Sequence, residues 1–257
     1  MICWVVERAL AARNVSRAIV ATDDERIFEA VNRARYEVVM TSRDHASGTD
    51  RIAEVASTLE DYEIVVNIQG DEPLVSPLTI ERAVEAMLEG GTGVQGNRLK
   101  AKGDMVAEEI GIVTTWEPIE SAADVLNPAV VKIVIDGNER AVYFSRSPVP
   151  YPRDAVRRHG SLEAAIQKEP VLLTGFRKHT GLYVYRRDVL LAFAKWPQSA
   201  LERFESLEQL RALEHGVKIK AIKASTSSIG VDTLEDLERV RSILEEETCS
   251  VSRRLAV

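Results

Sequence analysis

Apolar residues at the start of the chain recur at two different spacings. Between residues 2 and 10 they recur every three or four positions, which predicts an amphipathic helix with an apolar face formed by Ile2, Val5, Val6, Ala9 and Leu10. Short apolar runs at 17–24 and 36–40 predict buried strands, and the stretch 25–35 predicts a helix between them. Strands and helices that alternate in this way predict an α/β fold with a mostly parallel, doubly wound sheet.

The same alternation continues toward the middle of the chain. A helix is expected over about Thr49–Leu59, and a strand follows in the apolar run that begins at Ile64. Ser76-Pro77 suit the N-cap and first position of another helix, which Gly90-Gly91 end. Residues 91–96 match the G-x-G-x-x-G dinucleotide fingerprint but follow a helix rather than a strand, so we assign them no phosphate.

The second half of the chain mixes a predicted hairpin with further strands and helices. Asp136-Gly137-Asn138 lies between two apolar runs and predicts a tight turn. We expect a strand running into a helix at 179–190, a helix at 201–215 and a strand at 217–224. A capped helix closes the pattern, and its inner face is formed by Leu237, Val240 and Leu244. The polar tail beyond this face is expected to fray.

Composition and charge argue against several classes of protein. The 257 residues are 45% hydrophobic and 28% charged, which is ordinary for a globular domain. A formal net charge of −7 argues against a general nucleic-acid binder, which needs a basic face. Cys3 and Cys249 have neither metal-ligand nor disulfide spacing, so we expect a reducing cytoplasm. We find no apolar run of the roughly 18 residues that a membrane span needs, and no signal-peptide pattern.

One apolar run ends abruptly in a glycine and two acids. Residues 64–73 read IVVNIQGDEP, so a strand that is apolar on both faces is followed closely by Gly70 and Asp71. We expect such a strand in the interior of a sheet, where ligands bind beyond the carboxyl ends of the strands. Gly70 permits a close backbone approach there, and Asp71 is placed to hold a hard cation such as Mg²⁺.

A second acid occurs in a similar context far downstream. Asp232, in SSIGVDTLED, follows a short run of apolar residues and glycine and precedes a helix. The spacing is equally compatible with a simpler alternative, in which Asp71 begins a turn and Asp232 caps the helix.

Six segments spread over nearly the whole chain, from about Met1 to Leu244, resemble one enzyme family. They are MTSRDHASGTDRIAEV, VVNIQGDEP, AVYFSRSPVPYPR, HTGLYVYRRDVL, LEQLRAL and GVDTLEDLERV. Together they are similar to 3-deoxy-D-manno-octulosonate (Kdo) cytidylyltransferase, also called CMP-Kdo synthetase. The resemblance implies a Rossmann-like nucleotidyltransferase fold and transfer of CMP from CTP to Kdo, with release of pyrophosphate, for lipopolysaccharide biosynthesis. It also implies a Mg²⁺-dependent homodimer.

The resemblance implies roles for particular residues. The metal-binding and catalytic acids would be Asp71 and Asp232. The nucleotide would be bound by Ser47, Gly48, Gln69 and Gly70, of which the first two open a helix whose N–H groups can meet phosphate. The sugar would be bound by Gln69, Arg146, His179, Tyr183, Glu208 and Gln209, since Kdo carries a carboxylate and several hydroxyls. On spacing alone Ser47 is equally compatible with a plain helix cap, Glu208 and Gln209 with a helix surface, and Tyr183 with the core.

We expect one cytidylyltransferase domain over residues 1–257. Its nucleotide-binding part would cover about 1–115, its sugar-binding and dimerisation part about 116–215, and its last strand and helix 216–245. Two alternatives remain open at this point. One is an acylneuraminate cytidylyltransferase, which carries out the same chemistry on another acidic keto-sugar. The other is an inactive paralogue that only binds a nucleotide or pairs with a partner.

The sequence departs from the family at its first residues. The family's opening strand and its basic phosphate loop have no counterpart here, and Met1-Ile2 corresponds to residues just after that loop. We therefore expect residues 1–257 alone to be poorly soluble or to expose unpaired strand edges, and to form little CMP-Kdo. About 25 further residues upstream, enough for one strand and loop, would then restore activity.

Overall fold

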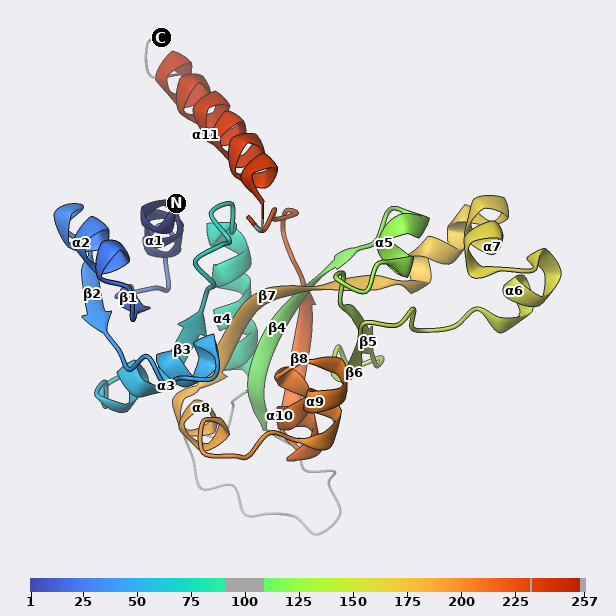
Figure 1. The fold of residues 1–257 in the computed structure, drawn as a ribbon, viewed down its shortest axis with the longest axis horizontal. Coiled ribbons are helices and arrows are strands. Elements are labelled where there is room, and N and C mark those ends of the chain that lie inside the picture. Colours follow the sequence, from blue (N-terminus) through green and yellow to red (C-terminus); the bar gives the residue numbers. More distant parts are fainter. Residues whose placement is uncertain (91–108, 232, 255–257) are drawn as a thin grey trace. The chain divides into compact units, whose positions relative to one another are not determined.

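The structure is a computed structural model that describes residues 1–90, 109–231 and 233–254 (Figure 1). The chain forms two compact units, and neither is continuous in sequence. Unit 1 consists of Met1–Val55, Ile68–Glu81 and Ser225–Val257, and unit 2 of Ala56–Asn67 and Arg82–Ala224. None of the described helices is both long enough and apolar enough to cross a lipid bilayer.

Unit 1 begins with the alternating helices and strands that the sequence predicts. They are α1 (Ile2–Leu10), β1 (Ile19–Thr22), α2 (Glu25–Arg33), β2 (Glu37–Met40) and α3 (Gly48–Ser57). The two strands pair in parallel, with Ile19 opposite Glu37. Val6, Val20 and Val31, one from each of α1, β1 and α2, form a buried cluster, so the apolar periodicity of this region builds a small core.

Two further helices belong wholly or partly to unit 1. Helix α4 (Pro77–Gly90) starts in unit 1 and ends in unit 2, and it begins at the proline predicted for its first position. Helix α11 (Leu234–Arg254) continues well past Leu244, so the prediction of a frayed tail there is wrong.

Unit 2 is built on a six-stranded mixed sheet. Its strands are β3 (Ile64–Asn67), β4 (Ile110–Pro118), β5 (Lys132–Ile135), β6 (Ala141–Ser145), β7 (Arg177–Arg186) and β8 (Lys218–Lys223). The order is β6-β5-β7-β4-β8, and β3 also pairs with β7. Strand β7 is antiparallel to its neighbours β3, β4 and β5, whereas β8 is parallel to β4 and β6 antiparallel to β5. Four strands therefore run in one direction (β3, β4, β5 and β8) and two in the other (β6 and β7).

This sheet confirms the expected α/β class but changes the neighbours of its strands. Most strands share a direction, as predicted, yet most adjacent pairs are antiparallel, because the long strand β7 lies between the others (Figure 1). Strand β3 pairs on one side only, with β7, among the described residues, so it is not the interior strand that its apolar sequence predicts. Strand β1 likewise pairs with β2 alone in the described parts of unit 1.

The predicted hairpin joins β5 to β6. Asp136 Oδ1 accepts hydrogen bonds from the backbone N–H groups of Asn138 and Arg140, both at 2.8 Å, which closes the turn. The turn then reaches β8, since the Ala221 N–H donates to the Glu139 carbonyl at 2.7 Å. The backbone of Arg140 also forms an isolated antiparallel β-bridge with Lys220, so the hairpin covers part of the edge of β8.

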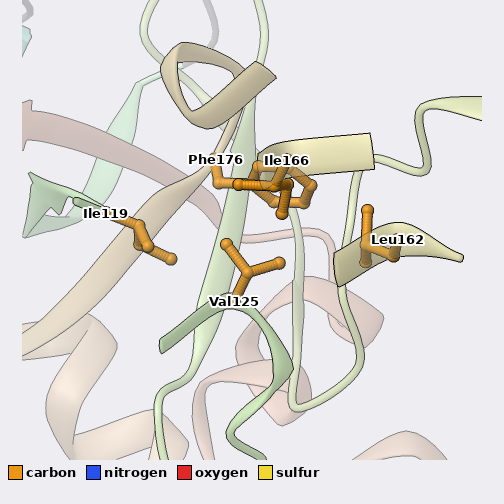
Figure 2. Packing of buried hydrophobic residues seen from close by; sticks show 5 residues of the cluster. All are labelled: Ile119, Val125, Leu162, Ile166 and Phe176. Carbon is orange, nitrogen blue, oxygen red and sulfur yellow. The ribbon is translucent and has the colours of Figure 1, made fainter. Parts of the chain in front are cut away.

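A second apolar cluster forms where β4 and β7 meet short helices that the sequence did not reveal. These are α5 (Ala122–Leu126), α6 (Arg153–His159), α7 (Leu162–Lys168) and the 3₁₀-helix η1 (Pro170–Gly175). The cluster consists of Ile119, Val125, Leu162, Ile166 and Phe176, and its side chains converge from several elements (Figure 2).

The predicted helix 201–215 is two helices in the structure. Helix α9 (Ala200–Glu205) ends at Ser206, whose φ of 53° is left-handed, and α10 (Gln209–Glu214) follows. The buried side chains of Arg211 and Glu202 join the two helices, since the guanidinium donates hydrogen bonds of 2.5 and 2.8 Å to the two carboxylate oxygens. Glu202 also closes a capping box with Ser199, and the Arg211 guanidinium lies 4.4 Å from the centre of the Phe193 ring in α8 (Arg187–Phe193).

We predict that Arg211→Met lowers the free energy of unfolding by about 3–5 kcal/mol, because it leaves the Glu202 carboxylate buried without its countercharge. The double variant Glu202→Gln/Arg211→Met should recover most of this loss, since neutral glutamine still caps α9. Urea denaturation measures the free energy of unfolding of both variants. The control is Arg17→Met, which removes an exposed ion pair with Glu37 and should change this free energy by only about 0–1 kcal/mol. A double variant no more stable than Arg211→Met would contradict the prediction.

Candidate functional site

Asp71 lies in a turn of unit 1 that the last segment of the chain contacts. The turn begins at Gln69, whose carbonyl accepts a hydrogen bond from the Glu72 N–H at 3.2 Å. Asp71 is exposed, and its carbonyl accepts from the Val231 N–H at 2.8 Å. The predicted partner acid Asp232 follows Val231 directly in sequence but lies outside the described residues.

Several hydroxyl groups hold the segment 225–231 beside this turn and the start of α4. The Ser228 hydroxyl donates to Glu72 Oε2 at 2.5 Å. The Ser225 N–H donates to the Thr79 hydroxyl at 3.0 Å, and the Ser225 hydroxyl to that of Ser76 at 3.0 Å. These contacts hold the segment 225–228, which precedes Asp232, against the segment 72–79, which follows Asp71.

The turn offers the exposed carboxylate of Asp71 to a cation. Mg²⁺ takes one or two carboxylates and leaves its other positions to water and phosphate. The part of the chain that the structure describes holds no cluster of three or more His, Cys, Asp or Glu side chains placed as metal ligands. Whether Asp71 and Asp232 share one ion stays a prediction.

The residues predicted to bind the nucleotide also lie in unit 1: Ser47 and Gly48 at the start of α3, and Gln69 and Gly70 just after β3. The Ser47 hydroxyl accepts from the Asp50 N–H at 3.2 Å and donates to Asp50 Oδ2 at 2.9 Å, so Ser47 caps the helix as its alternative reading predicted. A Cβ at Gly48 would lie 3.1 Å from Gln69 Oε1, so glycine lets the Gln69 amide approach the helix start closely. The structure therefore brings Ser47, Gly48 and Gln69 together, with Gly70 and Asp71 next along the chain.

His179 and Tyr183, predicted on the sugar side, lie on β7 in unit 2. The Thr114 hydroxyl donates to the Leu182 carbonyl, so His179 Nε2, at 2.9 Å from that hydroxyl, is the donor to it. This leaves Nδ1 as the acceptor nitrogen of the ring. Burial lowers the pKa of His179 to about 3, so the imidazole is neutral at physiological pH.

Tyr183 and Glu208 lie close to His179. The rings of His179 and Tyr183 are 5.3 Å apart between centroids. Tyr183 is buried, as the core alternative predicted, and burial raises its pKa well above its usual value. The neighbouring Tyr185 and the Glu208 carboxylate raise this pKa further, which places Glu208 near the phenol.

Arg146 connects β6 to the turn that carries Glu208. Its guanidinium donates to the backbone carbonyls of Glu205, Pro128 and Ser206 at 2.7, 3.0 and 3.2 Å. Gln209, at the first position of α10, is only 5% exposed, so the surface alternative is wrong for this residue. The structure thus brings His179, Tyr183 and Glu208 together in one corner of unit 2, where Arg146 holds the turn that precedes Glu208 and Gln209.

Two residues that support this corner were missed in the sequence. Glu205 accepts from the Ser145 hydroxyl at 2.7 Å and from the Arg146 N–H at 2.9 Å. Lys132 is completely buried, and its ammonium donates to the carbonyls of Asn127, Val130 and Arg146 at 3.0, 2.7 and 2.6 Å. Burial lowers its pKa below the usual range. A lysine inside the apolar run VVKIVID was the available signal.

The glycine-rich segment 91–96, to which we assigned no phosphate, lies outside the described residues.

Comparison with known proteins identifies the family. Residues 1–219 match the family described as cytidylyltransferase. The 3-deoxy-manno-octulosonate cytidylyltransferase of Trichlorobacter lovleyi is 43% identical over 246 residues, which cover 96% of this chain and 88% of that protein. The protein of the same name from Geobacter sulfurreducens is 46% identical over 240 residues, covering 93% and 87%.

Solved structures agree with this assignment. The structure of CMP:2-keto-3-deoxy-manno-octonic acid synthetase complexed with CTP matches with a TM-score of 0.78 and 36% identity, over 96% of this chain and 88% of that one. A 4-diphosphocytidyl-2C-methyl-D-erythritol synthase from Anaerococcus prevotii, at a TM-score of 0.53 and 13% identity, shares the fold alone. The predicted nucleotidyltransferase fold is confirmed. The chain belongs to the 3-deoxy-manno-octulosonate cytidylyltransferase family.

Proposed function

We propose that this protein transfers CMP from CTP to Kdo and releases pyrophosphate, and that it acts in the cytoplasm to supply lipopolysaccharide biosynthesis. The observation that carries the proposal is the corner of unit 2 where His179, Tyr183 and Glu208 lie together and Arg146 holds the turn that precedes Glu208. It combines a cation with neutral and acidic hydrogen-bonding groups, which suits an acidic sugar with several hydroxyls. The names of the relatives and the CTP in the matching structure support both substrates.

We propose that Asp71 and Asp232 hold a Mg²⁺ ion, which neutralises charge on the triphosphate when bound. The residues around them have separate tasks. Ser47 and Gly48 would present the N-terminal N–H groups of α3 to the nucleotide. Gln69, whose amide lies against Gly48, would orient the nucleotide, and through it the sugar. Gly70 would let the backbone approach the ligand closely.

The sugar-side residues would bind and orient Kdo. The hydrogen bonds of Arg146 to the carbonyls of Glu205, Pro128 and Ser206 use three of the five N–H donors of its guanidinium, and the others suit the sugar carboxylate. Neutral His179 offers Nδ1 as an acceptor to a hydroxyl, and Tyr183 remains protonated as a donor. Glu208 and Gln209 would accept from and donate to further hydroxyls. None of these residues is required to change its charge.

We further propose that the protein is a homodimer formed through the region 116–215. Several large apolar side chains are well exposed in this region, with exposed fractions between 57% and 94%; they are Val142, Tyr151, Val171 and Phe204. Exposed side chains of this kind are suited to a subunit interface.

The direct test measures pyrophosphate and CMP-sugar formation from CTP by the purified 257-residue chain, with Mg²⁺, and Kdo or N-acetylneuraminate as acceptor. Even where total turnover is low, we expect kcat/KM for Kdo to exceed that for N-acetylneuraminate by at least about tenfold, a difference of about 1.4 kcal/mol. Asp71→Asn should lower kcat by about a hundredfold or more, because it removes a charge from the proposed ion site. A preference for the neuraminate, or full activity of Asp71→Asn, would refute the respective assignment.

Arg146→Ala tests the sugar corner. We expect the KM for Kdo to rise about tenfold to a hundredfold, the equivalent of about 1.5–3 kcal/mol for a lost hydrogen bond to a charged group, while the KM for CTP changes less than about twofold. Arg158→Ala is the matched control, since this arginine of unit 2 forms an ion pair with Glu169, away from the residues assigned to the sugar. Equal changes in both KM values for Arg146→Ala would assign it a purely structural role.

Buried, neutral His179 predicts a pH dependence of stability. The unfolded imidazole, with its usual pKa near 6.5, gains a proton as the pH falls, whereas the folded one stays neutral until about pH 3. The free energy of unfolding should therefore decrease by up to about 1.4 kcal/mol per pH unit below pH 6.5 on account of this residue. His179→Gln should lack this component, and Thr114→Val, which leaves the ring buried, should retain it. Urea titrations between pH 7 and 4.5 that show equal slopes for wild type and His179→Gln would contradict the prediction.

A further inference from the structure

Two side chains of α3 hold the loop that leads into that helix. The loop, residues 41–47, connects β2 to α3 in unit 1. Arg51 Nη1 donates to the Thr41 hydroxyl at 2.5 Å and to the Ser42 carbonyl at 3.2 Å. Glu54 Oε2 accepts from the Ser42 N–H at 3.1 Å. Both backbone polar groups of Ser42 are therefore bound by side chains of the helix that follows the loop.

The same two side chains also reach beyond Ser42. Arg51 Nη2 donates to Asp23 Oδ2 at 2.9 Å, so this guanidinium joins the end of β1 to the end of β2. Glu54 Oε2 also meets His45 Nε2 in the middle of the loop. The contacts from His45 and from the Ser42 N–H lower the pKa of Glu54, so its carboxylate stays charged at neutral pH.

The geometry of these contacts suits a positioning role. Arg51 and Glu54 are three residues apart on α3, so their side chains leave the same side of the helix. The Arg51 side chain is 18% exposed and contacts two segments of the chain distant from it in sequence. By contrast, Arg26 in unit 1 is 91% exposed and pairs with Asp24 two residues away. A planar guanidinium can donate to several acceptors in fixed directions, which lysine cannot do.

We infer that Arg51 and Glu54 are positioning residues for the nucleotide. They fix the start of α3, where Ser47 caps the helix and Gly48 faces the Gln69 amide. This inference rests on the proposed function, because the nucleotide contacts of Ser47 and Gly48 belong to that proposal. Arg51 and Glu54 act on the nucleotide only through the loop and the helix start, and neither touches the substrate.

The test combines kinetics with hydrogen exchange in the full chain. Arg51→Ala should raise the KM for CTP about tenfold, as expected for lost hydrogen bonds to a charged group, and change the KM for Kdo less than twofold. Arg51→Lys should recover only part of the loss. Glu54→Ala should raise the KM for CTP several-fold, and Glu54→Gln, which keeps an oxygen for the Ser42 N–H, should restore most of it. The control Arg26→Ala should behave as wild type.

Hydrogen exchange followed by mass spectrometry reports on the loop without any substrate. Amides of residues 42–50 should exchange at least about fivefold faster in Arg51→Ala, whereas those of α2 should be unchanged. Unchanged exchange at 42–50 overturns the inference, and so does an equal rise in both KM values. If wild type does not use CTP, the proposed function and the nucleotide role fall together. The exchange rates then still decide whether Arg51 holds the loop.

Discussion

The buried ion pair of Glu202 and Arg211 sets the local geometry of the turn in unit 2 that carries Glu208 and Gln209, two residues predicted to bind the sugar. It joins α9 to α10 across a left-handed residue at Ser206, and that turn presents Glu208 and Gln209. A charged pair in an apolar interior is stable only when its geometry satisfies both partners. Here the Phe193 ring covers the guanidinium, and a capping box orients the carboxylate. The position of the predicted sugar-binding residues therefore depends on a pair that touches no substrate.

Polar side chains bonded to backbone groups are a recurring device in both units. In unit 2, Arg146 and Lys132 each donate to three backbone carbonyls, which fixes the chain around the corner without regular secondary structure. In unit 1, Arg51 and Glu54 do the same for a loop, and the Thr79 hydroxyl does so for the segment before Asp232, where it accepts from the Ser225 N–H. Functional residues on irregular segments need this kind of support, because such segments have no ladder of backbone hydrogen bonds of their own.

Much of unit 1 could be predicted because its elements obey local rules. The apolar spacing of α1 and the short strands at 19–22 and 37–40 depend on nearby residues, so periodicity found them. Periodicity did not show that the predicted helix 201–215 is divided into α9 and α10, because the two helices are held together by a contact between Glu202 and Arg211, nine residues apart. The burial of Gln209 follows from the same packing. Strand β3 looked interior because its residues are apolar on both faces, but apolar residues do not specify which strands pair. Among the site residues, Gly70 and Asp71 could be picked out in the sequence because they follow an apolar run. The supporting roles of Lys132 and Glu205 could be recognised only from the hydrogen bonds that they make in the structure.

The hairpin at 136–139 has a consequence for protein engineering. Its tip is at the surface and contains glycine and asparagine, features that usually mark a tolerant place for an epitope tag or an inserted domain. Here the tip also occupies part of the open edge of β8, through the Glu139 carbonyl and the Arg140–Lys220 bridge. An insertion that lifted the tip would free N–H and C=O groups of an alternating apolar strand for pairing with other chains. Such a fusion would favour self-association through β8, so a label on this protein is better placed away from the hairpin.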